Sequence, residues 1–324
     1  MNGLFWNCRG AGKRGRTTCF SDIMRDHSLD FMGILETKKD KFVPRYLRKI
    51  DPFERFNWNG IPSIGKSGGI LCGIKKETLE IVSWAAGNYI LQAIVFDTKI
   101  KCAWTLVVVY GAAHDEKRDE FLDELTSFCG NIKTPYVIGG DFNILRNSSD
   151  KNKSPRRSQH MDRFNSVIQS LNLGEIHMGG GRLTWTNKQR HPTFEKLDIV
   201  LMSFDSEDLF PLVVVRKLVR DISGHNPLLL TTNPLKNSPM HMREFRFELS
   251  WLKNEEFYAK AKMIWEQHVQ AEDPIDILNI KLKRIKKYIK GWGSHLFGHA
   301  KKRKKWSKKE LEEIEEGGGW PRGS

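Results

Sequence analysis

The sequence predicts an α/β protein in which two β-sheets pack face to face and helices cover their outer surfaces. Many short segments rich in β-branched and aromatic residues read as strands, and helical periodicity recurs only intermittently between them. A parallel βαβ sheet would require regular alternation of strands and helices, so a two-sheet sandwich explains the pattern better. A hydrophobic content of 39% supports a substantial core.

These elements occupy residues 1–232, which we expect to form one domain. The predicted strands are apolar runs bounded by turn residues, at residues 2–6, 31–35, 79–85, 90–96, 104–110, 135–138, 183–186, 197–201, 212–215 and 228–232. A further apolar stretch runs from the glycines at 68–69 to residue 74. Helices are expected where apolar side chains recur on one face, at residues 17–26, 116–129 and 161–171.

The composition changes after this domain. Residues 233–243 read as a linker, 244–316 as a basic helical extension and 317–324 as an unstructured tail. Between Ile275 and Leu296, apolar residues recur at alternating spacings of three and four, which is the seam of a packing helix. That seam either packs on its own domain or pairs with a partner.

The positive charge is concentrated in this extension. The net charge is +14, and residues 281–309 contain thirteen Lys or Arg and no acidic residue. The other 40 basic residues nearly balance the 39 acidic ones. Nucleic acid is the favoured partner, ahead of an anionic membrane or a merely solvated helix face. Substrate-binding candidates here are Lys301, Lys302 and Arg303, within a run that also suits a nuclear import signal.

The composition also excludes several classes of protein. Apolar content argues against global disorder, and no apolar run reaches the ~18 residues of a membrane span. The first nine residues lack the layout of a secretory signal. Five widely spaced cysteines without a CxxC pair argue against zinc knuckles and indicate free thiols in a reducing compartment.

Two polar residues follow apolar strands in the N-terminal part. Asn7 follows the first predicted strand, and Glu36 follows the run 31–35. A carboxylate at the end of a buried strand is well placed to bind Mg²⁺, and the Asn7 carboxamide can orient it or contact a phosphate. Taken singly, each residue is also explained as an ordinary polar group at a strand end.

Asp141 and Asn143 carry a stronger signal. They follow the apolar run 136–138 and Gly139-Gly140, which permit close backbone approach. Residues two apart in an extended segment point the same way, so both side chains are expected to converge. Asp can accept a proton from water and Asn can position a phosphate. The alternative is an Asx turn.

His225 directly precedes the last apolar strand of the domain. An imidazole beside carboxylates can stabilise a pentavalent phosphate, whereas a lone histidine is more often structural. Asp198 is flanked by apolar residues, and a half-buried carboxylate requires a partner. We therefore expect Asp198 and His225 to pair.

In this order, the segments WNCRG at 6–10, GGDFN at 139–143, LTWTN at 183–187 and KLD at 196–198 resemble the endonuclease/exonuclease/phosphatase superfamily. Within it they look most like the endonuclease domain of plant non-LTR (LINE-type) retrotransposons. The segment from Phe245 to Gly293 looks like the region that joins this domain to a reverse transcriptase. The resemblance implies a four-layer α/β sandwich with two mixed β-sheets, and a chain truncated before the reverse transcriptase.

The resemblance also implies roles for single residues. Asn7 and Glu36 would hold Mg²⁺. The catalytic residues would be Tyr110 on the phosphate, Asp141 activating water, Asn143 orienting the phosphate, and His225 oriented by Asp198. Thr184 would be a polar support or a DNA contact, and Asn187 a substrate-binding residue of the same segment. The substrate would be nuclear DNA and the protein a monomer, so we expect a nuclear, otherwise cytoplasmic, non-secreted protein.

One residue departs from the family pattern. The family motif Ser-Asp-His is here Ser223-Gly224-His225. Loss of that carboxylate should weaken metal binding, and removal of a transition-state group commonly costs ~10²–10³ in rate. We therefore expect an impaired DNA endonuclease, whose activity rises if an aspartate is restored. The competing hypotheses are a non-cleaving nucleic-acid-binding remnant, a lipid or inositol phosphatase, and a scaffold that uses the 275–296 seam.

Overall fold

The computed structural model describes residues 1–65, 68–153, 158–220, 223–233 and 254–269, and positions 277–278, 280–282, 284–285 and 288–289. The chain divides into two units, residues Met1–Lys236 and Asn237–Ser324. No helix in the described ranges is long and apolar enough to cross a lipid bilayer.

The first unit contains two mixed sheets. The seven-stranded sheet has the order β10-β14-β15-β1-β2-β4-β3. Its strands are β10 (Met178–Gly179), β14 (Val214–Lys217), β15 (Leu228–Thr231), β1 (Asn2–Asn7), β2 (Phe31–Leu35), β4 (Ile70–Lys75) and β3 (Phe56–Ile61). The pairs β1–β2 and β10–β14 are parallel and the others antiparallel.

The six-stranded sheet has the order β5-β6-β7-β8-β13-β9. Its strands are β5 (Leu79–Ala86), β6 (Ile90–Asp97), β7 (Cys102–Tyr110), β8 (Tyr136–Asp141), β13 (Asp198–Ser203) and β9 (Leu173–Glu175). Only β7 and β8 run parallel. A separate ribbon pairs β11 (Trp185–Thr186) with β12 (Phe194–Glu195).

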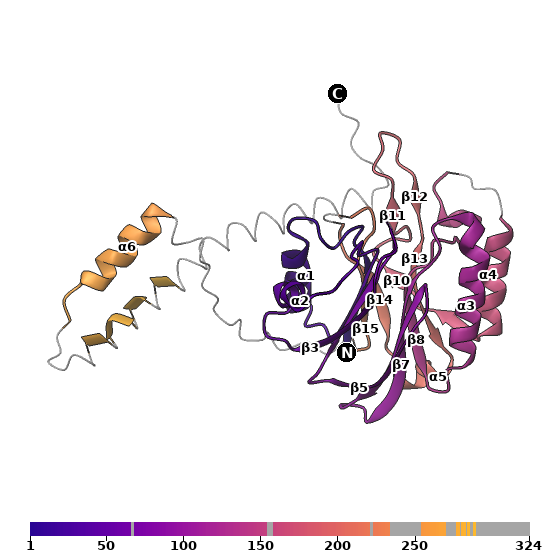
Figure 1. Ribbon diagram of the computed structural model, residues 1–324, viewed down its shortest axis with the longest axis horizontal. Helices are drawn as coiled ribbons and strands as arrows, with labels where there is room; N and C mark the ends of the chain where they lie inside the picture. Colours follow the sequence, from indigo (N-terminus) through magenta and orange to yellow (C-terminus); the bar gives the residue numbers. More distant parts are fainter. Residues whose placement is uncertain are drawn as a thin grey trace. The chain divides into compact units, whose positions relative to one another are not determined.

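Helices cover the outer face of each sheet, as Figure 1 shows. On the seven-stranded sheet lie α1 (Arg16–Asp26) and α2 (Pro44–Ile50), where Phe20 packs edge-on against Trp6. On the six-stranded sheet lie α3 (Arg118–Gly130) and α4 (Gln159–Ser170), whose Phe121 and Phe164 flank Phe142. The short helix α5 (Asp205–Leu209) follows β13. The predicted four-layer α/β sandwich is confirmed.

The main core lies between the two sheets. Phe5 and Phe31 of the first sheet meet Trp104 and Val108 of the second in one buried cluster. Gly139 on β8 leaves room for the Phe5 ring, because a Cβ there would lie 2.6 Å from it. Close packing of this kind brings β1 and β8 together and fixes the separation of the sheets.

Several short elements were not anticipated. They are α2, β3, α5, β9, β10 and β12. The β3 segment contains two asparagines and a glycine, residues that are depleted in strands, and pairing with β4 overrides that preference. The expected strand at 212–215 is shifted and runs as β14 from Val214 to Lys217, because its pairing with β15 continues to Leu228.

In the second unit, α6 spans Glu255–Glu266 and begins at Asn254, whose side chain accepts a hydrogen bond from the Phe257 amide. Phe257 is buried and stacks on Tyr288. Of the predicted seam, four residues lie in helical positions: Leu278, Leu282, Ile285 and Ile289. The two leucines are about half exposed, and the two isoleucines are less exposed. The ends of the seam, and most of the predicted linker and all of the tail, lie outside the described residues.

Candidate active site

The candidate residues come from strand ends at one edge of the sandwich. Asn7 is the last residue of β1 and pairs with Leu35 at the end of β2, so Glu36 follows beside it. On the other sheet, Asp141 at the end of β8 pairs with Tyr110 on β7 and with Asp198 on β13. The strand register within each sheet therefore brings its polar residues to the same edge. Face-to-face packing of the two sheets then brings the polar residues of one sheet next to those of the other.

A cavity of about 520 Å³ opens at this edge. It is lined by Asn7, Arg9, Glu36, Tyr110, Asp141, Asn143 and His225, and further round by Arg118, Lys151, Trp185 and Glu195. Groups from both sheets thus face a single space. That convergence is the arrangement in which a hydrolytic site can work.

Asp141 lies at the centre of the cluster. Its Oδ2 accepts a hydrogen bond of 2.7 Å from the Asn7 carboxamide, and its Oδ1 accepts one of 3.0 Å from the Asn143 amide. Burial raises the pKa of Asp141 to about 6, and nearby Asp198 adds to this, while His225 and the Asn7 hydrogen bond oppose it. A carboxylate with a pKa near neutrality is suited to accept a proton from water.

Gly140 and Asn143 shape the turn that carries Asp141. Gly140 has φ +147°, and a Cβ there would lie 2.0 Å from the Val109 carbonyl oxygen, so only glycine fits. Asn143 has φ +52°, and its Nδ2 donates to the Gly111 carbonyl at 2.8 Å. Both residues line the cavity, as predicted, but the segment that carries them is not extended. The Asn143 backbone amide bonds Asp141 Oδ1, which is the Asx turn named as the alternative. A left-handed turn, closed by the Asn143 amide, brings both to the cavity.

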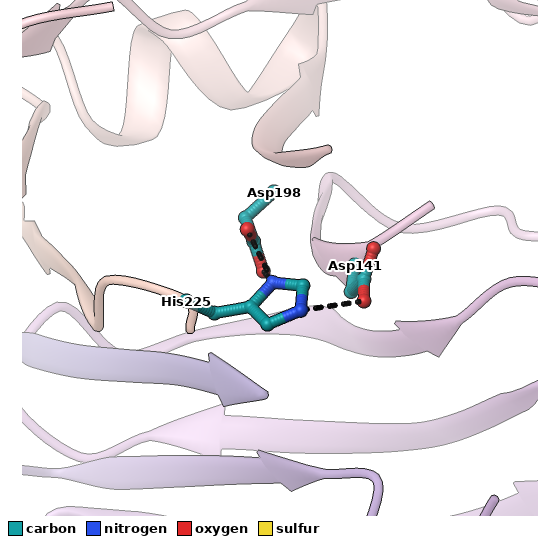
Figure 2. A group of neighbouring side chains, drawn as sticks. All are labelled: Asp141, Asp198 and His225. Atoms are coloured by element: carbon teal, nitrogen blue, oxygen red, sulfur yellow. Dashed lines mark hydrogen bonds and ion pairs between the residues drawn. The ribbon is translucent and has the colours of Figure 1, made fainter. Parts of the chain in front are cut away.

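Asp198 and His225 pair, as Figure 2 shows. The His225 Nδ1 lies 2.9 Å from Asp198 Oδ2, and its Nε2 lies 3.8 Å from Asp141 Oδ2. Burial opposes protonation of His225, but the carboxylates of Asp198 and Asp141 outweigh it and raise the pKa of the imidazole. The two carboxylates thus stabilise the imidazolium form, and the ring presents Nε2 towards Asp141.

The main chain around His225 is held from both sides. The Trp6 indole donates to the His225 carbonyl at 3.2 Å. The Ser223 hydroxyl donates to the Asn7 carbonyl at 2.7 Å and accepts from the His225 amide at 3.2 Å. Because Ser223 links His225 to the end of β1, the imidazole and Asn7 are positioned together.

Glu36 supplies a carboxylate that is already partnered. It is nearly buried, with an exposed fraction of 8%, and adopts φ +50°. Lys38 Nζ lies 2.9 Å from Oε1, and Arg9 Nε lies 3.7 Å from Oε2. Carboxylate and carboxamide oxygens of Glu36, Asn7 and Asp141 are the hard donors that Mg²⁺ prefers, so the residues fit such an ion. An ion there would compete with the two basic side chains for Glu36.

Replacing Lys38 by Gln is therefore expected to strengthen metal binding. The Mg²⁺ concentration for half-maximal activity should fall ~2–5-fold, the range for a partly exposed ion pair. A Mg²⁺ titration of activity measures it, with Lys75→Gln as the control, since Lys75 pairs with Glu77 away from the cavity. An unchanged midpoint in the Lys38 variant would show that this pair does not oppose the metal.

Tyr110 reaches the cavity from the end of β7. Burial raises the pKa of its hydroxyl, and the carboxylates of Glu36 and Asp141 raise it further. The phenol therefore stays protonated and is available as a hydrogen-bond donor, which is the property required of a phosphate contact.

The two candidates in the 183–187 segment make hydrogen bonds to neighbouring main chain. Thr184 is fully buried, and its Oγ1 accepts from the amides of Leu197, at 3.2 Å, and Asp198, at 3.0 Å. Thr184 therefore supports the main chain at Asp198. Asn187 Oδ1 accepts from the Thr193 amide at 3.0 Å and stabilises the β11–β12 turn. Lys301, Lys302 and Arg303 lie outside the described residues.

Gly224 sits where the β11 backbone passes closely. The Thr186 amide donates to the Gly224 carbonyl at 3.0 Å, and a Cβ on residue 224 would lie 2.8 Å from the Thr186 carbonyl oxygen. Any side chain there requires movement of that backbone. An aspartate therefore cannot simply be restored at this position, which changes the expectation drawn from the sequence.

The structure adds cavity residues that the sequence did not single out for a role. Arg9 lies in the WNCRG motif and Trp185 in the LTWTN motif, so a signal for both was present in the sequence. Arg118 and Lys151 come from the α3 start and from the segment before α4, and their positions carry no motif. Arg118 is ion-paired with Asp115 and Lys151 with Glu195. The cavity is thus lined by basic as well as acidic groups.

Two packed mixed sheets with carboxylates, carboxamides and a histidine–aspartate pair at one edge define an α/β sandwich of the phosphoesterase type. Residues 4–214 match the profile of the endonuclease/exonuclease/phosphatase family, and the chain belongs to that family. Among curated proteins, no sequence matches the chain significantly.

Solved structures share the fold at low identity, and each aligns with 71% of this chain. The endonuclease domain of TRAS1, a telomere-specific non-LTR retrotransposon, is 16% identical over 97% of its length, with a TM-score of 0.55. The 3'-5' exonuclease NExo from Neisseria meningitidis is 15% identical over 99%, with 0.57. The AP endonuclease LMAP from Leishmania major is 14% identical over 86%, with 0.53.

Proposed function

We propose that this protein is a Mg²⁺-dependent phosphodiesterase that nicks DNA, a DNA endonuclease of retrotransposon origin. The observation that carries the proposal is the meeting of Asn7, Glu36, Asp141, Asn143 and His225 at one cavity. Support also comes from the family, from the related fold of the TRAS1 endonuclease domain, and from a NExo variant that is named as a 3' phosphatase and is bound to a product DNA hairpin. DNA in chromatin as substrate implies the nucleus.

Each polar group has a task in cleaving a phosphodiester. Glu36 and Asn7, with Asp141 beside them, would hold Mg²⁺, which polarises the phosphoryl oxygens and offsets developing charge. Asp141, with its raised pKa, accepts the proton of the attacking water. Asn143 and the protonated Tyr110 orient the phosphate. His225, held by Asp198, stabilises the charge that accumulates on the phosphoryl oxygens.

A plasmid-nicking assay tests the proposal. The wild-type chain is expected to nick in Mg²⁺ and to stop in EDTA, and Glu36→Ala should lower the rate by at least ~10²-fold. Glu77→Ala is the matched control, because Glu77 is an exposed carboxylate with a lysine partner outside the cavity. Equal rates for wild type and the Glu36 variant would refute the hydrolase. A phosphomonoester substrate run beside the plasmid tests a phosphatase.

The alternative is a remnant that binds nucleic acid without cutting it. Two observations favour it: no carboxylate stands at Gly224, and both oxygens of Glu36 face basic side chains. In that case DNA binding would persist while the wild-type chain fails to nick at any Mg²⁺ concentration. An active enzyme, even a slow one, would instead show that the remaining donors suffice for cleavage.

A further inference from the structure

We propose that Arg9 binds the DNA phosphate at the catalytic cavity, and that Gly224 leaves its guanidinium without a second carboxylate neighbour. The proposal rests on the proposed function, since it names how that site grips its anionic substrate. It assigns a positive role to the position at which the chain lacks an acid.

The backbone presents Arg9 at the cavity. Arg9 follows β1 with φ +50°, a left-handed conformation that an arginine rarely adopts. Its amide donates to Asn7 Oδ1 at 3.0 Å, and the next amide, of Gly10, donates to the Glu36 carbonyl at 2.8 Å. Strained residues persist where surrounding contacts hold them, and they cluster at functional sites. Glu36 and Asn143, with φ +50° and +52°, show the same feature at this cavity.

The guanidinium is available to an anion. The Arg9 side chain is 45% exposed and lines the cavity with Glu36, Asp141 and His225. Its Nε lies 3.7 Å from Glu36 Oε2, beyond hydrogen-bond distance, and Glu36 has a nearer partner in Lys38 at 2.9 Å. A planar guanidinium presents a fork of donors that matches the oxygens of a phosphate. A phosphate held here lies beside Asp141 and His225.

The absence of a side chain at residue 224 is matched to Arg9. A Cβ on Gly224 would stand 3.4 Å from an Arg9 terminal nitrogen and 3.4 Å from the Trp185 indole nitrogen, besides its 2.8 Å approach to the Thr186 carbonyl. A carboxylate at 224 would face the guanidinium directly and cancel the charge offered to phosphate. With glycine at 224, no carboxylate from that position offsets the charge of Arg9.

Binding of short duplex DNA in EDTA tests the proposal without metal or turnover. In fluorescence anisotropy, Arg9→Gln should weaken binding about tenfold and reduce the salt dependence of the affinity by about one phosphate contact. Arg9→Lys should keep the salt dependence and recover part of the affinity, because it keeps the charge without the fork. Arg25→Gln is the matched control, since the Arg25 side chain is 49% exposed and pairs with acids of α1. If Arg9→Gln and Arg25→Gln bind the duplex with the same affinity, the proposal is overturned.

Variants at Gly224 test the second half. Gly224→Ala and Gly224→Asp should both weaken DNA binding in EDTA, and the aspartate more, with melting temperatures recorded to separate misfolding from lost contact. Tighter binding or faster nicking by Gly224→Asp would overturn the matching of Gly224 to Arg9. The proposed function fails separately: a wild type that never nicks, while Arg9→Gln still loses DNA affinity, refutes the hydrolase and retains the phosphate site.

Discussion

Replacing Asp198 by Asn is expected to lower the nicking rate by ~10²–10³-fold and to move the alkaline limb of its pH profile to lower pH. The Asp198 carboxylate lies 2.9 Å from His225 Nδ1 and is a main reason for the raised pKa of the imidazole. A raised pKa extends the pH range in which His225 is protonated, and activity that needs the cation is lost as pH rises through that pKa. Removing the carboxylate lowers the pKa, so the loss begins earlier.

The measurement is the nicking rate at saturating Mg²⁺ from pH 5 to pH 9. Asp97→Asn is the control, because Asp97 is also buried and accepts hydrogen bonds from the Lys99 and Ile100 amides, far from the cavity. A slower Asp198 variant whose alkaline limb coincides with wild type would show that the carboxylate only orients the ring. Equal rates would exclude a catalytic dyad.

Replacing Asp141 by Asn should lower nicking by ~10³-fold and, in EDTA, remove a pH-dependent cost to stability. Burial raises the folded-state pKa from 3.8 to about 6. The folded protein therefore favours the protonated carboxyl. That contribution is complete below pH 4 and is lost as pH rises through 6, at a cost of ~2–3 kcal/mol. An asparagine does not titrate and avoids this loss.

Urea unfolding at pH 4.5 and pH 8 in EDTA measures the change. The unfolding free energy of the Asp141→Asn variant, relative to wild type, should rise by ~2 kcal/mol between the two pH values. The exposed Asp40→Asn serves as the control, and its difference from wild type should stay constant. A constant difference for the Asp141 variant would mean that the carboxyl titrates alike in the folded and unfolded chains.

The fold could be predicted from local apolar patterns, and the site from the polar residues that follow each apolar run. Alternating or continuous apolar runs located the long strands, and the polar residue after each run marked the edge of a sheet, as at Asn7, Glu36 and Asp141. The Asp198–His225 pair followed from the need of a buried carboxylate for a partner, and the structure joins the two at 2.9 Å. Short elements held mainly by neighbours, such as α2 and β3, have no comparable local signal.

The roles of Thr184 and Gly224 required three-dimensional contacts. Thr184 is polar and lies in a motif, but only burial and its two backbone hydrogen bonds show that it supports Asp198. Gly224 looked like a simple loss of an acid. The Thr186 carbonyl oxygen, 2.8 Å from where a Cβ would stand, shows that the lack of a side chain is a spatial requirement. Such coincidences between distant segments are invisible in a linear pattern.

The contact between Phe5 and Gly139 affects the geometry of the active-site cavity. Each stands two residues before a reactive group in its own strand, Phe5 before Asn7 and Gly139 before Asp141. The 2.7 Å hydrogen bond from the Asn7 carboxamide to Asp141 therefore depends on how closely the Phe5 ring packs against the Gly139 backbone. A methyl group at residue 139 would push β1 and β8 apart, and so separate Asn7 from Asp141, without changing any catalytic side chain.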